Sequence, residues 1–233
     1  MRILGLTNAR GGSKGIPKKN LSHLKGKPLI QYTIDVARRT GIFVDYIVST
    51  DDQEIADVAR KLGADVPIIR PVSLATDTSP QIDTVSFMLE ELKKRSRTYD
   101  LVVLLQPTSP FRTVKDVQTT VSLASDSCEG YAFTASPVVS SHPYYMYWWD
   151  GEHACQVIKP DPLLPQQRQY LPEVVIRNGA VYVTPVHIIV EQRILYGPNP
   201  KIHVMTPERG VNINTPFDWA WAEFLLEQGL VSA

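Results

Sequence analysis

A cluster of glycines and cations near the amino terminus has the residue types that bind phosphate. The stretch from Asn8 to Asn20 reads NARGGSKGIPKKN, and its cations are Arg10, Lys14, Lys18 and Lys19. Glycine lets the backbone turn tightly and approach a ligand, and inward N–H groups with lysines form a concave anion site. The stretch therefore predicts a polyphosphate site, and the alternative is a solvated basic turn.

The position of this loop favours the phosphate interpretation. It follows the apolar run Ile3–Leu6, which predicts a buried strand, and open α/β sheets bind ligands where strands end. The loop contains neither the Walker A pattern nor the Gly-x-Gly-x-x-Gly pattern of dinucleotide sites. If the loop binds phosphate, it does so through a different sequence signature.

The loop resembles the Arg-x-Gly-Ser-Lys-Gly-x-x-x-Lys-Asn signature of the acylneuraminate (CMP-sialic acid) cytidylyltransferase family. The matching residues are Arg10, Gly12, Ser13, Lys14, Gly15, Lys19 and Asn20. The resemblance implies that Arg10, Lys14 and Lys19 stabilise charge on the phosphates of CTP during catalysis. It also implies nucleotide contacts from Ala9, Gly11, Gly12, Ser13 and Asn20.

Two further loops match segments of the same family. The first contains Arg70-Pro71, Leu74-Ala75 and Asp77, and the second is Gln106-Pro107-Thr108-Ser109-Pro110 after the apolar run Leu101–Leu105. The resemblance implies that these loops contact the cytosine, the ribose and the phosphates. The nucleotide candidates are Arg70, Asp77, Ser79 and Gln106, and the substrate candidates are Gln106, Thr108 and Ser109. Taken alone, either loop is also explained by turn chemistry.

Arginines in two later segments are candidates for an acidic second substrate. The family has an Arg-Gln-x-Leu-Pro segment followed by Asn-Gly-Ala-x-Tyr, and this chain has similar runs at 167–172 and 177–182. A carboxylate suits the guanidinium fork, so the candidates are Arg168 and Arg177, together with Asn178. Surface salt bridges are the alternative role for these arginines.

The metal site of the family is altered in this chain. The family has Asp-x-Asp, and its aspartates hold magnesium, whereas this chain has Asn212-Ile213-Asn214. Alternating residues on a strand share one face, so the pair could still chelate, but Mg²⁺ prefers charged oxygens. We expect Mg²⁺ or another divalent cation to be required, held largely by the triphosphate, with Asp218 as a third candidate ligand.

Strand and helix patterns alternate along the chain and predict an α/β fold. After the loop we expect a helix from Leu29, a strand at 46–48, a helix at 53–62 and a short edge strand at 64–69. A helix after Pro80, the strand 101–105, a helix at 114–124 and strands at 131–134 and 203–205 follow. A last helix after Thr215 is expected to turn five residues toward the sheet: Phe217, Ala220, Trp221, Phe224 and Leu225. We predict one domain over residues 1–233, a Rossmann-like nucleotidyltransferase with a mostly parallel central sheet.

Residues 137–173 differ from the rest of the chain. They are rich in proline and carry the aromatic residues Tyr144, Tyr145, Tyr147, Trp148 and Trp149. So short a stretch makes a poor independent domain, and exposed aromatics favour a protein interface. The alternative is that these rings cover the core of the parent domain. The family places a small β-rich dimerisation arm here, so the resemblance implies a homodimer.

Composition limits the kinds of partner. The 233 residues include 24 Lys plus Arg and 24 Asp plus Glu, so the net charge gives no reason to expect nucleic-acid or membrane-surface binding. Two cysteines, Cys128 and Cys155, indicate a reducing compartment. No signal peptide and no apolar stretch of membrane-spanning length is visible. A cytoplasmic location is expected.

The predicted function is a cytidylyltransferase. It would join CTP to an acidic 2-keto-3-deoxy sugar of the sialic, legionaminic or pseudaminic type and release pyrophosphate. Direct attack on the α-phosphorus would depend on positioning and charge neutralisation rather than on a covalent intermediate. Two alternatives remain: a CTP-dependent enzyme for another small acid such as a phosphonate, and a weakly catalytic nucleotide-binding homologue.

Overall fold

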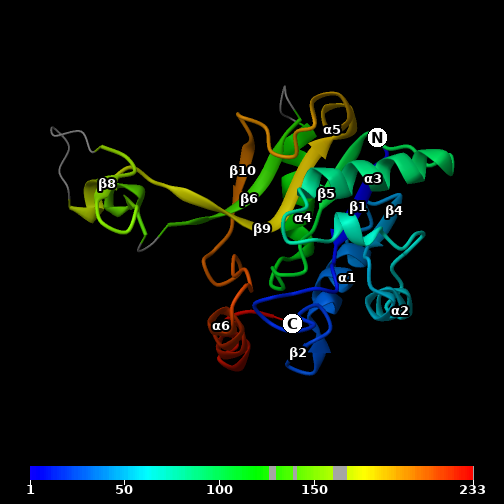
Figure 1. The fold of residues 1–233 in the computed structure, drawn as a ribbon, viewed down its shortest axis with the longest axis horizontal. Helices are drawn as coiled ribbons and strands as arrows, with labels where there is room; N and C mark the ends of the chain where they lie inside the picture. Colours follow the sequence, from blue (N-terminus) through cyan, green and yellow to red (C-terminus); the bar gives the residue numbers. More distant parts are fainter. Residues whose placement is uncertain (126–129, 139–140, 160–166, 233) are drawn as a thin grey trace.

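A six-stranded sheet forms the centre of the protein (Figure 1). The computed structural model describes residues 1–125, 130–138, 141–159 and 167–232. The strand order is β10-β6-β9-β5-β1-β4. The bounds are β1 (Ile3–Asn8), β4 (Asp45–Ser49), β5 (Leu101–Leu104), β6 (Ala132–Pro137), β9 (Val175–Pro185) and β10 (Lys201–Val204).

The predicted, mostly parallel sheet is confirmed, with one exception. β1 pairs in parallel with β4 and β5, and β10 pairs in parallel with β6. β9 runs antiparallel to both β5 and β6. The carboxyl ends of β1, β4 and β5 therefore meet at one edge, which is where ligands bind in such sheets.

Helices cover both faces of the sheet. Their bounds are α1 (Leu29–Arg39), α2 (Gln53–Lys61), α3 (Gln81–Lys94), α4 (Val114–Ser125), α5 (Val186–Gln192) and α6 (Pro216–Glu227). α1 and α4 pack on one face through Val36 and Val117, and α3 and α5 cover the other through Met88 and Ile189. The helices hold the strand ends, and the loops that follow them, in fixed positions.

Local sequence sets several helix ends close to the site. Asp52 caps α2, because its Oδ1 accepts from the Ile55 N–H at 3.0 Å. Gly63 follows α2 with a φ of +85°, which glycine adopts without strain. Thr215 and Asp218 form a reciprocal capping box at the start of α6. These caps explain why the predicted boundaries of the two helices are close to the observed ones.

The described residues of the 137–173 arm project from the body of the molecule, at the left of Figure 1. It contains an antiparallel pair, β7 (Tyr147–Trp149) and β8 (Ala154–Gln156). Trp148 and Trp149 are 67% and 66% exposed. The remaining short elements are β2 (His23–Leu24), β3 (Lys27–Pro28) and 3-10 turns at Val72–Leu74, Pro143–Tyr145 and Arg168–Tyr170. In this chain the exposed arm rings do not cover a core.

Two segments that were expected to be strands are not regular strands in the structure. The predicted strand at 64–69 is reduced to isolated bridges of Asp65 with Ile47 and Ile69 with Thr50. Pro67 has no N–H to give, so the ladder does not continue. The segment 211–214 is not a strand either. It runs as an irregular connection into α6.

The predicted inner face of α6 is wrong for most of its residues. Leu225 is buried as expected, but Phe217, Trp221 and Phe224 are 80%, 44% and 44% exposed, Ala220 is exposed as well, and Ala222 is buried. Trp219 and Leu226 pack partly against the same core. Aromatic residues recur around α6, so sequence periodicity alone did not identify the buried stripe. Among the described residues, no helix has the length and apolar character needed to span a membrane.

Candidate active site

The glycine-rich loop joins β1 to α1 and is held by side chains on both sides. The Gly11 N–H donates to Asp51 Oδ1 at 3.1 Å, and Asn20 Nδ2 donates to the Arg10 carbonyl at 3.0 Å. A Cβ on Gly15 would collide with the backbone oxygen of Asn214. Glycine is therefore required where the loop crosses the 212–214 segment.

The loop forms one wall of a cleft of about 450 Å³. The other walls come from the 70–79 loop, from the loop after β5 and from the start of α3. The lining residues are Asn8, Arg10, Ser13, Lys14, Gly15, Lys19, Asn20, Arg70, Leu74, Ala75, Thr76, Asp77, Ser79, Gln81, Thr84, Gln106, Pro107, Thr108 and Asn214. Segments far apart in the sequence thus converge at the carboxyl ends of β1, β4 and β5.

Asp77 neutralises two cations of the loop. Arg10 Nη2 lies 2.8 Å from Asp77 Oδ1, and Lys14 Nζ lies 2.6 Å from Asp77 Oδ2. The hydrogen bond from Lys14, with help from Arg10, holds the pKa of Asp77 below its usual value. Because all three groups are at least partly exposed, a more highly charged anion could replace this carboxylate.

Lys19 is the most enclosed lysine of the loop. Its Nζ donates to the Ile213 carbonyl at 2.8 Å, across the cleft from the loop backbone. Burial lowers the pKa of Lys19, and the nearby Arg10 lowers it further. A desolvated ammonium of this kind interacts more strongly with a bound anion than an exposed lysine does.

Arg70 lies deep in the cleft wall. It is 3% exposed, and its guanidinium faces Ser49 and Asp51 at 3.4 and 3.6 Å. Burial lowers the pKa of Arg70, whereas Asp51 acts in the opposite direction. The Nε of Arg70 is buried without a hydrogen-bond partner. A donor in this state is available for a ligand.

The loop after β5 is fixed from behind by Arg112. This arginine is 2% exposed, donates to the carbonyls of Ala180 and Gln106, and contacts Thr33 Oγ1 at 2.6 Å. Burial lowers the pKa of Arg112 to about 10. The Thr108 carbonyl accepts from the Ile213 N–H at 2.7 Å. Gln106 and Thr108 are thereby held at the cleft.

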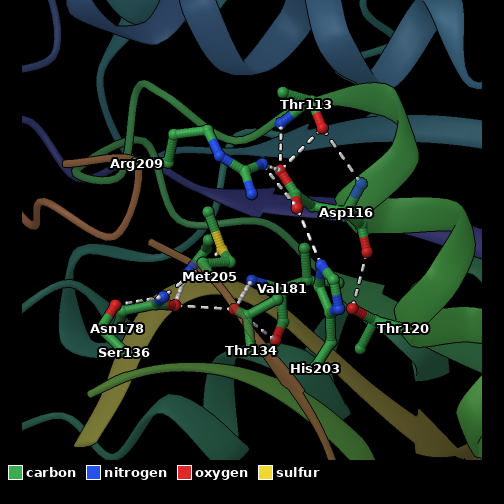
Figure 2. A network of polar contacts seen from close by, with 11 residues as sticks. Thr113, Asp116, Thr120, Thr134, Ser136, Asn178, Val181, His203, Met205 and Arg209 are labelled. Carbon is green, nitrogen blue, oxygen red and sulfur yellow. Dashed lines mark hydrogen bonds and ion pairs between the residues drawn. The ribbon is translucent and has the colours of Figure 1, made fainter. Parts of the chain in front are cut away.

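A buried polar network lies behind the cleft (Figure 2). The Asn178 amide accepts from Thr134 Oγ1 at 2.7 Å and donates to Ser136 Oγ at 3.0 Å. The Asn178 carbonyl accepts from Ser109 Oγ at 2.9 Å. The side chains of Ser109 and Asn178 are occupied in this way and do not line the cleft.

Asp116 is the ionic centre of the same network (Figure 2). It is 1% exposed and accepts from Arg209 at 2.6 Å, from His203 at 2.8 Å and from the Thr113 N–H at 2.8 Å. Burial opposes ionisation, but the hydrogen bonds from His203, Thr113 and Arg209 leave the pKa of Asp116 below its usual value. The network anchors Arg209 and so fixes the segment that leads to Asn212 and Asn214.

The candidate metal ligands Asn212 and Asn214 lie close together, but neutral amides bind a divalent cation weakly. Asn214 Nδ2 donates to Asn212 Oδ1 at 3.3 Å, so the two amides do meet. Asp218 Oδ2 accepts from the Asn214 N–H, the Thr215 N–H and the Thr215 hydroxyl, as the cap of α6. No cluster of three His, Cys, Asp or Glu side chains suited to a metal ion occurs among the described residues. The donor set fits a divalent cation held mainly by another ligand.

Comparison with known proteins decides the family. The family model described as Cytidylyltransferase matches residues 4–146, which is more than half of the chain. The chain belongs to this cytidylyltransferase family. Its strand-end cleft and cationic loop lie within the matched range, apart from Asn214.

Similarity to individual cytidylyltransferases extends along the whole chain. The chain is 36% identical over 230 residues to the CMP-N,N'-diacetyllegionaminic acid synthase of Legionella pneumophila, covering 97% of each chain. It is 28% identical over 233 residues to the pseudaminic acid cytidylyltransferase of Campylobacter jejuni, covering 100% of each. A solved CMP:2-keto-3-deoxy-manno-octonic acid synthetase complexed with CTP shares the fold, with a TM-score of 0.70, 17% identity and coverage of 98% of this chain and 100% of that one.

The cytidylyltransferase cleft collects most of the predicted residues. Those lining it are Arg10, Ser13, Lys14, Lys19, Asn20, Arg70, Asp77, Ser79, Gln106, Thr108 and Asn214. The predicted residues outside its lining are Ala9, Gly11, Gly12, Ser109, Arg177, Asn178, Asn212 and Asp218. Arg177 stacks on the Tyr196 ring at 4.4 Å, and the side chain of Arg168 is outside the described part of the structure. The acid-binding roles of both arginines stay predictions.

Sequence reasoning missed several residues of the site, and three of them have a clear place in it. Asp51 holds the loop at Gly11, Arg112 holds the carbonyl of Gln106, and Asn8 lines the cleft. Asp51 and Asn8 follow predicted strands, which is the signal that could have found them. Arg112 gave no signal, because an arginine before a helix is usually a surface residue.

Proposed function

We propose that this chain transfers CMP from CTP to an acidic 2-keto-3-deoxy sugar of the legionaminic, pseudaminic or sialic type and releases pyrophosphate. The observation that carries the proposal is the convergence of Arg10, Lys14 and Lys19 with Gln106 in one cleft at the strand ends. The names of the full-length relatives support the acidic nine-carbon acceptor. Pyrophosphate release from CTP in the presence of such acids tests the proposal.

The chemistry follows from the positions of these cations. The anomeric hydroxyl oxygen of the acid would attack the α-phosphorus of CTP, and the bond from that phosphorus to the bridging oxygen would break. The loop cations would stabilise charge on the phosphates and on the leaving pyrophosphate. No protein nucleophile is needed, because the acceptor oxygen attacks directly.

Nucleotide binding would break the ion pairs that the Asp77 carboxylate makes with Arg10 and Lys14. Both side chains are cations that a triphosphate would need. A triphosphate carries more charge than one carboxylate and would displace it. We propose that the 72–79 loop then turns Asp77 away from the phosphates.

A divalent cation, Mg²⁺ or another, is part of the proposal. Asn212 and Asn214 would offer it amide oxygens, and Asn214 lines the cleft. When bound, the ion would neutralise charge on the triphosphate. A neutral pair in place of carboxylates is also the observation that favours the second candidate, a cytidylyltransferase for a different small acid such as a phosphonate, or a weakly catalytic homologue.

We also propose a homodimer formed through the arm at 137–173. Trp148 and Trp149 are about two-thirds exposed on β7, and rings so exposed are typical of interfaces. Neither Arg177 nor a described residue of the arm lines the cleft, so an arm from a second copy could complete the acid site. A cytoplasmic location is proposed as well, since the exposed Cys155 is a free thiol.

Light scattering tests the dimer. The wild-type chain is expected to have the mass of two chains at micromolar concentration. The variant Trp148→Ser, Trp149→Ser is expected to have the mass of one, because it loses the two most exposed rings among the described residues of the arm. Phe217→Ser is the matched control, since Phe217 is an 80% exposed aromatic on α6 rather than on the arm. A monomeric wild type, or a double variant that remains dimeric, would exclude this interface.

A further inference from the structure

Asn8 occupies the last position of β1 and has no assigned role. Leu4 and Leu6 precede it on the same face of the strand, and both are fully buried in the core that α3 covers. Period-two alternation would continue this apolar face at position 8, but an amide stands there instead. It lines the cleft together with Gln81 and Thr84 from the start of α3.

Both polar atoms of the Asn8 side chain lack a partner. Its Nδ2 and Oδ1 are buried, as is Arg70 Nε, and none of the three has a hydrogen bond. Among the described residues, the other buried side-chain atom in this state is Ser86 Oγ on α3, outside the lining of the cleft. Leaving such groups unpaired costs stability, so their retention in one wall points to a ligand that pairs them.

The set of free groups matches the edge of a base better than it matches a phosphate or a sugar. An asparagine amide presents an acceptor and a donor side by side, and Arg70 Nε adds a second donor. A phosphate would use the donors and leave Asn8 Oδ1 facing an anion. The cations suited to phosphate, Lys14 and Lys19, are supplied by the glycine-rich loop. A single ribose hydroxyl would pair fewer of the three atoms.

We propose that Asn8 binds the hydrogen-bonding edge of the cytosine of CTP. Its Oδ1 would accept from the exocyclic N4 amine and its Nδ2 would donate to N3, while Arg70 Nε donates to O2. This inference rests on the proposed function and names a specific base contact within it. Uracil offers the first two groups in reverse order, and a rotated amide would meet them, so rejection of UTP requires another residue.

Two substitutions at Asn8 separate recognition from structure. Asn8→Ala removes both polar atoms, and Asn8→Asp removes the donor while keeping the shape. Each is expected to weaken CTP binding at least about 10-fold in calorimetry, from the hydrogen bonds lost. Binding of inorganic tripolyphosphate should stay at the wild-type level in Asn8→Ala, because the base contact is absent from that probe. Ser86→Ala, which removes an unpaired hydroxyl outside the cleft, should leave both affinities unchanged.

The melting temperature of the nucleotide-free protein gives an independent readout. Asn8→Ala should melt at the same temperature as the wild type or higher, since it removes unpaired buried groups. A fall of several degrees, with equal losses of CTP and tripolyphosphate binding, would show a structural role and overturn the inference. Wild-type CTP affinity in both Asn8 variants would overturn it and leave the proposed function standing. A wild type that does not bind CTP would overturn both.

Discussion

Lys19→Ala is expected to lower kcat by about 100- to 1,000-fold, the usual effect of removing one preorganised charge-stabilising donor. Lys19 is the loop lysine most withdrawn from water, and it lines the cleft with Arg10 and Asn214. Its ammonium would therefore act on the phosphates with little screening. Steady-state pyrophosphate release at saturating CTP measures the effect, and Arg10→Ala should behave similarly.

Lys18→Ala is the matched control for this loss. Lys18 is adjacent in the sequence but exposed, and it pairs with Glu54 at 2.6 Å instead of lining the cleft. Its removal should change kcat less than about twofold, as for most surface pairs. Melting temperatures of both variants check that the fold survives. Near-normal turnover in Lys19→Ala and Arg10→Ala would contradict the assignment of this loop as the phosphate site.

The fall in rate at alkaline pH should report on the ionisation of Lys19. Burial and Arg10 lower the pKa of Lys19, so its ammonium loses its proton at a lower pH than an exposed lysine would. The rate should fall as the pH rises through that value, because only the charged form stabilises phosphate. In Lys19→Arg the fall should move to higher pH, since arginine stays charged. If the rate falls over the same pH range in Lys19→Arg and in the wild type, the fall belongs to another group.

Removal of divalent cations should abolish activity, although Asn212 and Asn214 offer neutral amides rather than carboxylates. The described residues supply no cluster of three carboxylates, histidines or cysteines for a metal. Mg²⁺ commonly binds through substrate phosphates plus one or two protein groups, so the triphosphate can provide the main ligands. We expect complete loss of turnover in EDTA and recovery on adding Mg²⁺. Full activity in EDTA would refute the requirement.

Replacing Asn212 and Asn214 by aspartate tests whether these amides contribute to metal binding. The variant Asn212→Asp, Asn214→Asp should need less Mg²⁺ than the wild type for half-maximal rate, because carboxylates bind a hard cation more strongly. Asp218→Asn serves as the contrast, since Asp218 caps α6 through Thr215 and should affect melting more than metal demand. A higher Mg²⁺ demand in the double variant would show that the added charge repels the triphosphate instead.

The sequence predicted the parts of the site that depend on short, local patterns. The phosphate loop is defined by glycines and cations within a few residues, and its place after β1 follows from one apolar run. Arg70, Asp77 and Gln106 could be placed near it because strand ends of a parallel sheet meet at one edge. The structure brings Arg70, Asp77 and Gln106 to one cleft with the loop cations Arg10, Lys14 and Lys19.

The missed features depend on contacts between distant segments. The hydrogen bonds of the Asn178 amide with Thr134 and Ser136 behind the cleft are one example, and its substrate role stays a prediction. Arg112 supports Gln106 from a buried position that no periodicity reveals. The pairing of Asp77 with Arg10 joins residues far apart in the chain. Such pairings arise from tertiary packing, which one sequence does not display.

The most direct test of the central claim is product formation from CTP across a panel of acids. The chain with Mg²⁺ should release one pyrophosphate for each CMP-acid detected by mass spectrometry, with a legionaminic, pseudaminic or sialic acid as acceptor. CTP should be strongly preferred to ATP and GTP, because a site built around base-edge hydrogen bonds rejects bases that leave its groups unpaired. Equal use of all nucleotides, or no CMP-acid from any member of the panel at any metal concentration, would contradict the account.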